Sequence, residues 1–274
     1  MRVGCTAAGT PIASHVVPLL DVTLTLFIGL VTGGLSSTVG VGGAVISTPG
    51  IRALGASPLE GVGSTLPSIL PSAITGTRRY WREGLVFGPV VAKVVPWGAL
   101  AAVAGALASV RFPGKGHVQM ILSALLVLFT AWRTSRPAHS TEDDASADTH
   151  FEWWRCALIG LGAGGLSGFL GVGGGILMVP AFRGWLRLGL KATIATSLAC
   201  VGLLAIPSTA THIVEGTVDW AFALPLCIGV IPGAHLGSRW TVGATDRQLR
   251  MFIGVGLGVL GVAYFVAETV ALVG

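Results

Sequence analysis

The feature that most constrains this chain is a series of apolar stretches, each long enough to cross a lipid bilayer. A membrane-spanning helix needs about 20 mostly apolar residues. Stretches of this kind lie near residues 16–38, 59–77, 85–110, 117–133, 155–178, 192–213, 219–240 and 249–272. Charged residues make up only 11% of the chain, against about 25% in soluble domains, which leaves too little charge to coat a soluble fold. We therefore predict an all-α polytopic membrane protein with about eight transmembrane helices.

The apolar stretches fall into two sets that are copies of each other. Residues 29–49 read GLVTGGLSSTVGVGGAVISTP and residues 160–180 read GLGAGGLSGFLGVGGGILMVP, so that 11 of 21 positions are identical at an offset of 131. With a one-residue slip, the register continues through Ser64-Thr65 against Thr196-Ser197 and Glu83-Gly84 against Glu215-Gly216. This order of matches indicates an internal duplication, a recurring plan in secondary transporters.

The duplication divides the chain into four parts. We predict an N-terminal segment (1–15), a first transmembrane repeat (16–133), a polar acidic linker (134–152) and a second transmembrane repeat (153–274). Four spans in each half would make the repeats parallel, whereas the distribution of basic residues hints at inverted repeats. The sequence leaves both arrangements open.

The densest motif of each repeat is a glycine cluster followed six residues later by proline. The clusters contain Gly40, Gly42 and Gly43, and Gly171, Gly173 and Gly174. Several glycines in one turn disfavour a helix, and backbone groups freed within a bilayer must be buried in protein or face a cavity. We predict two broken or re-entrant helices whose half-helix N-termini meet centrally and bind an anion. Close helix packing is the alternative, and it is the preferred interpretation of Gly29, Gly33, Gly160 and Gly164.

Polar side chains in the second span of each repeat are further candidates for the site. Ser64-Thr65 and Thr196-Ser197 occupy equivalent positions, and their hydroxyls can donate to an anion or bond a carbonyl one turn back.

Three of the ionisable side chains within or near the apolar stretches are candidates for a role in transport. Lys93 is a candidate counter-charge for an anion, unless it extends to the membrane surface. His212 and His235 are candidates for coupling transport to protons, with a packing role as the alternative.

Several function classes lack the motifs that they require. The glycine clusters lack the GxGxxG spacing of a dinucleotide fingerprint and no predicted strand precedes them, so we do not predict a dinucleotide fold. GxxxxGK[ST] is absent from the sequence, which excludes a P-loop ATPase. HExxH, CxxC and GxSxG are also absent from it, and we predict no enzyme, no cofactor and no metal site. The basic residues lie in clusters between apolar stretches, which is typical of loops at a membrane face and not of nucleic-acid binding.

The twin glycine segments resemble the TauE/SafE family of membrane permeases, also called sulfite exporters. The patches GVGSTL and ATSLA support the resemblance, which covers nearly the whole chain except the first fifteen residues and the central linker. It implies a permease of about seven or eight spans, with relatives that are associated with sulfite, sulfoacetate and other small organic anions. The family motif carries over to Gly40, Gly42, Gly43 and Pro49, and to Gly171, Gly173, Gly174 and Pro180. Ala44 departs from Gly175 of the second copy.

Together these observations predict a secondary transporter, and more specifically an exporter, of small anions across a cell inner membrane. Its partners would be membrane lipid, the anionic substrate and, as a coupling ion, a proton or sodium ion. A uniporter or channel is one alternative, because an inside-negative potential already favours anion export. A non-transporting membrane assembly factor is another.

Overall fold

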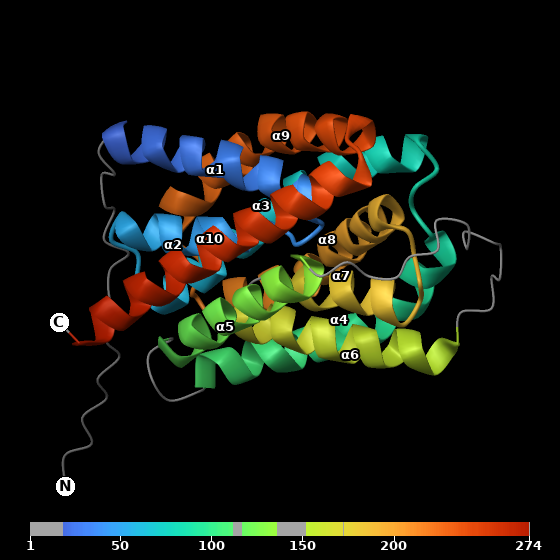
Figure 1. Cartoon of the computed structure of the whole chain (residues 1–274). Coiled ribbons are helices and arrows are strands. Elements are labelled where there is room, and N and C mark those ends of the chain that lie inside the picture. Colours follow the sequence, from blue (N-terminus) through green and yellow to red (C-terminus); the bar gives the residue numbers. More distant parts are fainter. Residues whose placement is uncertain (1–18, 112–116, 136–151, 172, 274) are drawn as a thin grey trace, which may run out of the picture.

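The computed structural model describes residues 19–111, 117–135, 152–171 and 173–273, and all the regular elements within them are α-helices (Figure 1). The helices of the first half are α1 (Leu19–Val39), α2 (Ala44–Ala53), α3 (Pro58–Arg82), α4 (Gly88–Arg111) and α5 (His117–Ser135). Those of the second half are α6 (Trp153–Leu170), α7 (Gly175–Gly184), α8 (Leu190–Val214), α9 (Trp220–Gly243) and α10 (Asp246–Val273). The predicted segment 1–15 and most of the predicted linker 134–152 lie outside the described residues.

The helices largely follow the predicted apolar stretches, with a difference at each glycine cluster. The stretch predicted at 155–178 is divided between α6 and α7, and α2 was in none of the predicted stretches. An apolar-length criterion misses α2 because it has only 10 residues and includes Ser47, Thr48 and Arg52. Among the described helices, α1, α4, α8 and α9 are long and apolar enough to cross a membrane.

Local sequence signals explain where α3 begins and ends. Ser57 and Glu60 form a capping box, in which each side chain bonds the backbone N–H of the other residue, and Pro58 stands in the first turn. The helix ends before Gly84, which has a φ of 69°. The equivalent Gly216 after α8 also has a φ of 69°. Positive φ favours glycine, so each Glu-Gly pair marks a corner of the chain.

The first two helices of each half form an antiparallel hairpin. Gly43 and Gly50 of the first hairpin lie against Ser36 and Ile28, respectively, so that α2 returns along α1. In the second hairpin, Gly174 lies against Ser167, and Leu177 lies against Gly162. Figure 1 shows the two hairpins entering the helical body from its opposite ends, α1 from the left and α6 from the right.

The two halves run in opposite directions. Close approaches between α1 and α9 advance together along both chains, from Gly29 and Gly229 to Gly34 and Gly233, so these helices are parallel. The α4 and α6 helices are parallel by the same criterion, whereas α3 and α8 are antiparallel. Because α4 and α9 each reverse the direction of the helix before them, α1 and α6 must point in opposite directions. The structure thus favours the inverted arrangement over the parallel one.

Glycines allow the first helix of each half to pack against the fourth helix of the other. A Cβ atom added to Gly33 would overlap the carbonyl group of Val230 on α9, and one added to the equivalent Gly164 would overlap that of Gly98 on α4. These contacts support the packing interpretation of the small-residue patterns in α1 and α6.

We expect Gly33→Ala to destabilise the protein by about 2–3 kcal/mol, because a methyl group would force two backbones apart. Gly34→Ala is the matched control, since its added Cβ would find its nearest neighbour, the carbonyl oxygen of Gly233, at 3.7 Å. Thermal unfolding in detergent should show a clear drop in midpoint for Gly33→Ala and little change for Gly34→Ala. Equal midpoints would contradict the close α1–α9 contact.

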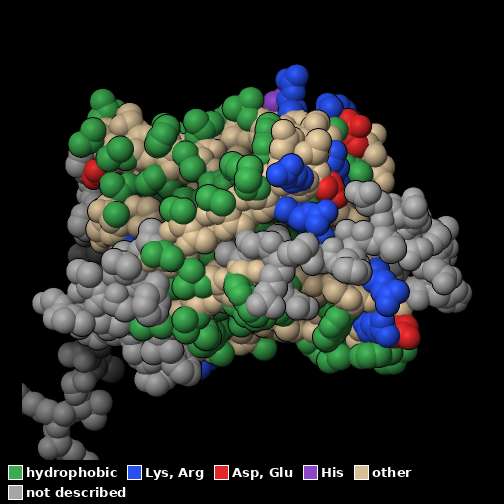
Figure 2. Space-filling model, in the orientation of Figure 1, with side chains coloured by type: hydrophobic (Ala, Val, Ile, Leu, Met, Phe, Trp, Pro, Cys, Tyr) green, Lys and Arg blue, Asp and Glu red, His purple; other side chains and the backbone are tan. Residues whose placement is uncertain are grey.

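Basic side chains gather at one end of the helical body, which we call the basic end. Here α3, α7 and α9 finish and α4, α6, α8 and α10 begin, and Figure 2 shows Lys and Arg side chains concentrated toward the right. The described residues of the basic end include Arg78, Arg79, Arg82, Arg155, Arg183, Arg187, Lys191, Arg239, Arg247 and Arg250. At the opposite end, the described basic residues are Arg52 and Arg111.

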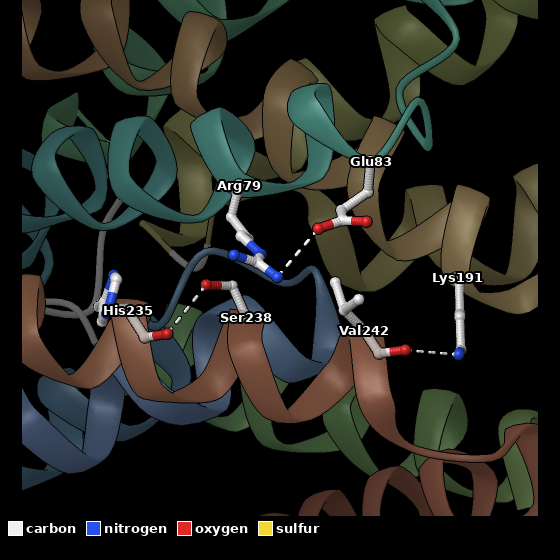
Figure 3. Close-up of polar contacts among 6 residues, drawn as sticks. All are labelled: Arg79, Glu83, Lys191, His235, Ser238 and Val242. Atoms are coloured by element: carbon white, nitrogen blue, oxygen red, sulfur yellow. Dashed lines mark hydrogen bonds and ion pairs between the residues drawn. The ribbon is translucent and has the colours of Figure 1, made fainter.

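Some of these basic side chains have structural partners (Figure 3). Arg79 pairs with Glu83 at 2.9 Å one turn along α3, and Lys191 Nζ donates to the carbonyl oxygen of Val242 at 2.8 Å. The second contact places a positive charge at the C-terminus of α9, where it is electrostatically favourable.

Candidate functional site

Two helix breaks formed by the glycine clusters are the centre of the candidate site. In the first, Gly40, Gly42 and Gly43 have φ angles of 76°, 94° and 80°. In the second, Gly171, Gly173 and Gly174 have φ angles of 68°, 89° and 64°. Non-glycine residues rarely adopt this conformation, so the sequence requirement for glycine here comes from the backbone. The predicted breaks are therefore present in both halves.

The breaks meet each other in the middle of the helical body. A Cβ atom on Gly42 would lie 3.5 Å from the Cα atom of Gly173, and one on Gly173 would lie 3.0 Å from the carbonyl oxygen of Val41. Ile69 and Val201 flank this contact and are fully buried. Each of these two residues is near the midpoint of a 25-residue helix, α3 or α8. The glycines brought together from the two halves thus lie at the centre of the fold.

The α2 and α7 helices begin at these breaks, and neither helix has a side-chain cap at its N-terminus. Their N-cap residues are Gly43 and Gly174, and neither offers a side chain to the first N–H groups. The N–H groups of Ile46 and Ser47 bond the carbonyl oxygen of Gly43, but no described acceptor bonds those of Ala44 or Val45. The start of a helix carries partial positive charge in addition to these free donors. Such an end favours a bound anion.

A buried hydroxyl without a partner stands beside each N-cap glycine. Thr32 of α1 is 1% exposed and lies against Gly43, and Ser167 of α6 is fully buried and lies against Gly174. Neither hydroxyl has a hydrogen-bond partner among the described residues. Leaving a buried polar group unsatisfied costs about 1–3 kcal/mol. Such groups call for an explanation, and a bound ligand is one.

Among the described residues, the nearest neighbours of the break glycines include hydroxyl side chains and no acidic side chain. The close neighbours of the six break glycines are backbone atoms and the side chains of apolar or hydroxyl residues. Free N–H and O–H groups without a carboxylate suit an anion better than a cation.

The four predicted hydroxyls all bond backbone atoms, three of them in other segments and the fourth in its own helix. Ser64 Oγ accepts from the backbone N–H of Asp219 at 2.8 Å, and Thr196 Oγ1 accepts from that of Phe87 at 3.1 Å. These two equivalent bonds hold the starts of α9 and α4. Ser197 Oγ donates to the carbonyl oxygen of Gly40 at 2.7 Å, which ties α8 to the first break.

The fourth hydroxyl, that of Thr65, has two neighbours. It donates to the carbonyl oxygen of Val62 at 3.0 Å and lies 3.3 Å from the hydroxyl of Thr48 on α2. Thr65 therefore links α3 to the first hairpin.

The three ionisable candidates are placed differently. Lys93 is half-buried in the second turn of α4 and interacts electrostatically with Cys156, about 22 Å along α6 from Gly171. His235 is exposed on α9, where its carbonyl oxygen accepts from Ser238 Oγ at 3.1 Å (Figure 3). The structure does not bring either residue to the breaks.

His212, in contrast, lies close to the second break. Its Nε2 atom is 3.4 Å from the carbonyl oxygen of Gly168, one helical turn before Gly171, and its Nδ1 atom is 2.8 Å from Thr217 Oγ1. Tyr80 occupies the equivalent position in α3 and donates to the carbonyl oxygen of Ser37 on α1. Both side chains thus anchor the end of the helix before a break.

Sequence reasoning did not select Thr32 or Ser167 for the site. Ser167 is one of the positions identical in both repeats, where it matches Ser36, so the duplication contained a signal for that pair. Thr32 matches Ala163, and only the hairpin geometry places it beside Gly43.

Comparison with known proteins identifies a family for the chain. The family model "Sulfite exporter TauE/SafE" matches residues 25–264. A "probable membrane transporter protein" of Bacillus subtilis, YunE, is 24% identical over 274 residues, covering 88% of this chain and 96% of the relative. A protein of the same description from Xylella fastidiosa is 24% identical over 255 residues, covering 89% of this chain and 94% of the relative.

No solved structure gives a significant match to the chain. The family match covers both helix breaks and both hairpins. The chain therefore belongs to the sulfite exporter TauE/SafE family of integral membrane transporters.

Proposed function

We propose that this protein is a secondary transporter of small oxyanions, which it binds where the N-termini of α2 and α7 meet. The observation that carries the proposal is the pair of helix N-termini without a side-chain cap at the centre of the fold, each beside a buried hydroxyl that has no hydrogen-bond partner among the described residues. A half-helix N-terminus at the interface between inverted repeats is a recurring substrate site in transporters.

Sulfite, sulfoacetate and related sulfur-containing organic anions are the proposed substrates, and export across the cell inner membrane is the proposed direction. The name of the family supports a sulfur oxyanion. At about 2.3 kcal/mol per charge per 100 mV, an inside-negative potential drives a monovalent anion outward. In the proposed layout, eight spans in two repeats move relative to each other around the central site.

Proton coupling is the proposed way to concentrate the substrate beyond the electrical driving force. His212 is the proposed coupling residue, and its contact with the carbonyl oxygen of Gly168, one turn before the second break, supports this role. A uniporter would need no such group, so the dependence of flux on pH distinguishes the two mechanisms.

Flux in proteoliposomes tests the proposed function. We expect the purified protein to move sulfite or sulfoacetate faster than chloride, with a rate that responds to an imposed electrical gradient. Acceleration by a pH gradient at constant potential would indicate proton coupling, and its absence would indicate a uniporter. Failure to move any anion in correctly folded, reconstituted protein would contradict the proposal.

A further inference from the structure

The two helix breaks are related by the duplication, but the donors around them are not the same. Resting on the proposed function, we infer that the anion is held on the α2 side, by Thr32 and Ser36 together with the first N–H groups of α2. In this arrangement the start of α7 lies opposite the start of α2 and donates no hydrogen bond to the anion.

The hydroxyls of the first half have no full counterpart in the second. Thr32 is matched by Ala163, and Ser72 is matched by Leu204. On α2 itself, Ser47 and Thr48 are matched by Met178 and Val179. All eight of these side chains are buried, and none is more than 1% exposed. The duplication thus places buried polar groups around the first break and apolar groups around the second.

Two hydroxyls of α1 have unused capacity to donate a hydrogen bond beside Gly43. Thr32 Oγ1 has no hydrogen-bond partner among the residues that the structure describes. Ser36 Oγ accepts from Ser72 Oγ at 3.1 Å, a bond that leaves the proton of Ser36 available. A Cβ atom on Gly43 would lie 2.7 Å from Thr32 Cγ2 and 3.1 Å from Ser36 Cβ, so both side chains reach the start of α2. The N–H groups of Ala44 and Val45, which follow Gly43, also bond no described backbone acceptor.

The start of α7 has fewer unused donors. The N–H of Gly175 bonds the carbonyl oxygen of Gly173 at 2.7 Å, whereas the equivalent N–H of Ala44 has no described acceptor. Gly175 also lies against the carbonyl oxygen of Gly40, which leaves little room for a ligand there. Ser167 remains the one unpartnered hydroxyl on this side among the described residues.

A small pocket adjoins the first break. Gly43 and Ser36 form part of its wall, and the rest is apolar. The lining consists of Leu35, Ser36, Val39, Val41, Gly43, Val45, Ile46 and Leu257. An anion at the start of α2 would therefore lie beside apolar groups, where a low local dielectric strengthens its hydrogen bonds.

A matched pair of variants tests the inference. We expect Thr32→Val, which keeps the side-chain shape, to weaken sulfite binding and raise the KM for flux by about tenfold. Ser167→Ala should leave both within about twofold of the wild type. Neither change should lower the melting temperature without ligand, because each removes an unpartnered buried hydroxyl. Sulfite-dependent thermal stabilisation gives the affinity, and proteoliposome flux gives the KM.

Thr32→Ser controls for packing, because it keeps the hydroxyl and removes the methyl group, and it should bind like the wild type. Equal weakening by Thr32→Val and Ser167→Ala would overturn the inference in favour of a symmetric site. Wild-type affinity in Thr32→Val would overturn it as well. If the wild type itself binds and moves no anion, the proposed function fails first and this inference fails with it.

Discussion

Replacing Gly42 or Gly173 with alanine is expected to lower anion flux by about tenfold or more. Each glycine has a φ near 90°, where a Cβ atom costs about 1–2 kcal/mol. Space is also lacking, because the added Cβ would lie 2.6 Å from Val201 Cγ1 at Gly42 and 3.0 Å from the Val41 carbonyl oxygen at Gly173. The backbone strain and the steric overlap both disturb the contact between the two breaks. The two substitutions should therefore impair the same step of transport. Flux per folded protein in proteoliposomes measures the effect.

Gly84→Ala is the control that introduces backbone strain without a steric overlap. Gly84 has a φ of 69°, but an added Cβ would find nothing within 4 Å. We expect this variant to lose about 1 kcal/mol of stability and to keep wild-type flux. If Gly42→Ala and Gly173→Ala transport as well as Gly84→Ala, the break contact is not part of the transport pathway.

A cysteine at position 214 is expected to react with a membrane-impermeant maleimide on intact cells, whereas one at position 82 is not. Arg82 and Val214 end α3 and α8, are equivalent in the duplication, and are both exposed. The inverted halves place them at opposite ends, with Arg82 at the basic end. Cytoplasmic faces of membrane proteins carry the excess of Lys and Arg, so the basic end should face the cytoplasm.

The labelling experiment needs a background in which all four native cysteines are replaced by alanine. Arg82→Cys should then be labelled only after permeabilisation, and Val214→Cys before it. Labelling of both cysteines on intact cells would contradict inverted halves, and the reverse pattern would contradict the assigned orientation.

The sequence could predict the breaks but not the course of the chain around them. Glycine clusters and the proline after each indicate an interrupted helix, and both interruptions are present at the predicted residues. The sequence left open whether each helix is broken or re-entrant, and the return of α2 along α1 is defined by packing, as of Gly50 against Ile28. The relative direction of the two halves also depends on packing, because α1 pairs with α9 through contacts between residues that are distant in the sequence.

The candidate site was predictable at its glycines and less so at its side chains. Positive φ leaves a strong sequence signal because other residues are disfavoured there. A site hydroxyl leaves no such signal in the sequence, because serine and threonine serve equally to bind an anion and to bond a neighbouring backbone group. Ser64 and Thr196 hold the starts of α9 and α4, whereas the unpartnered Thr32 is recognisable only from its position beside Gly43.

The most direct test of the central claim is the position of a bound oxyanion, located by anomalous diffraction from crystals grown with selenite, the selenium analogue of sulfite. We predict a selenium peak within hydrogen-bond distance of the N–H groups of Ala44 and Val45 and of the Thr32 hydroxyl. A peak at the start of α7 beside Ser167 would keep the paired breaks as the site but reject the preference for α2. A peak beside Lys93 or among the arginines of the basic end, with none at either break, would contradict the account.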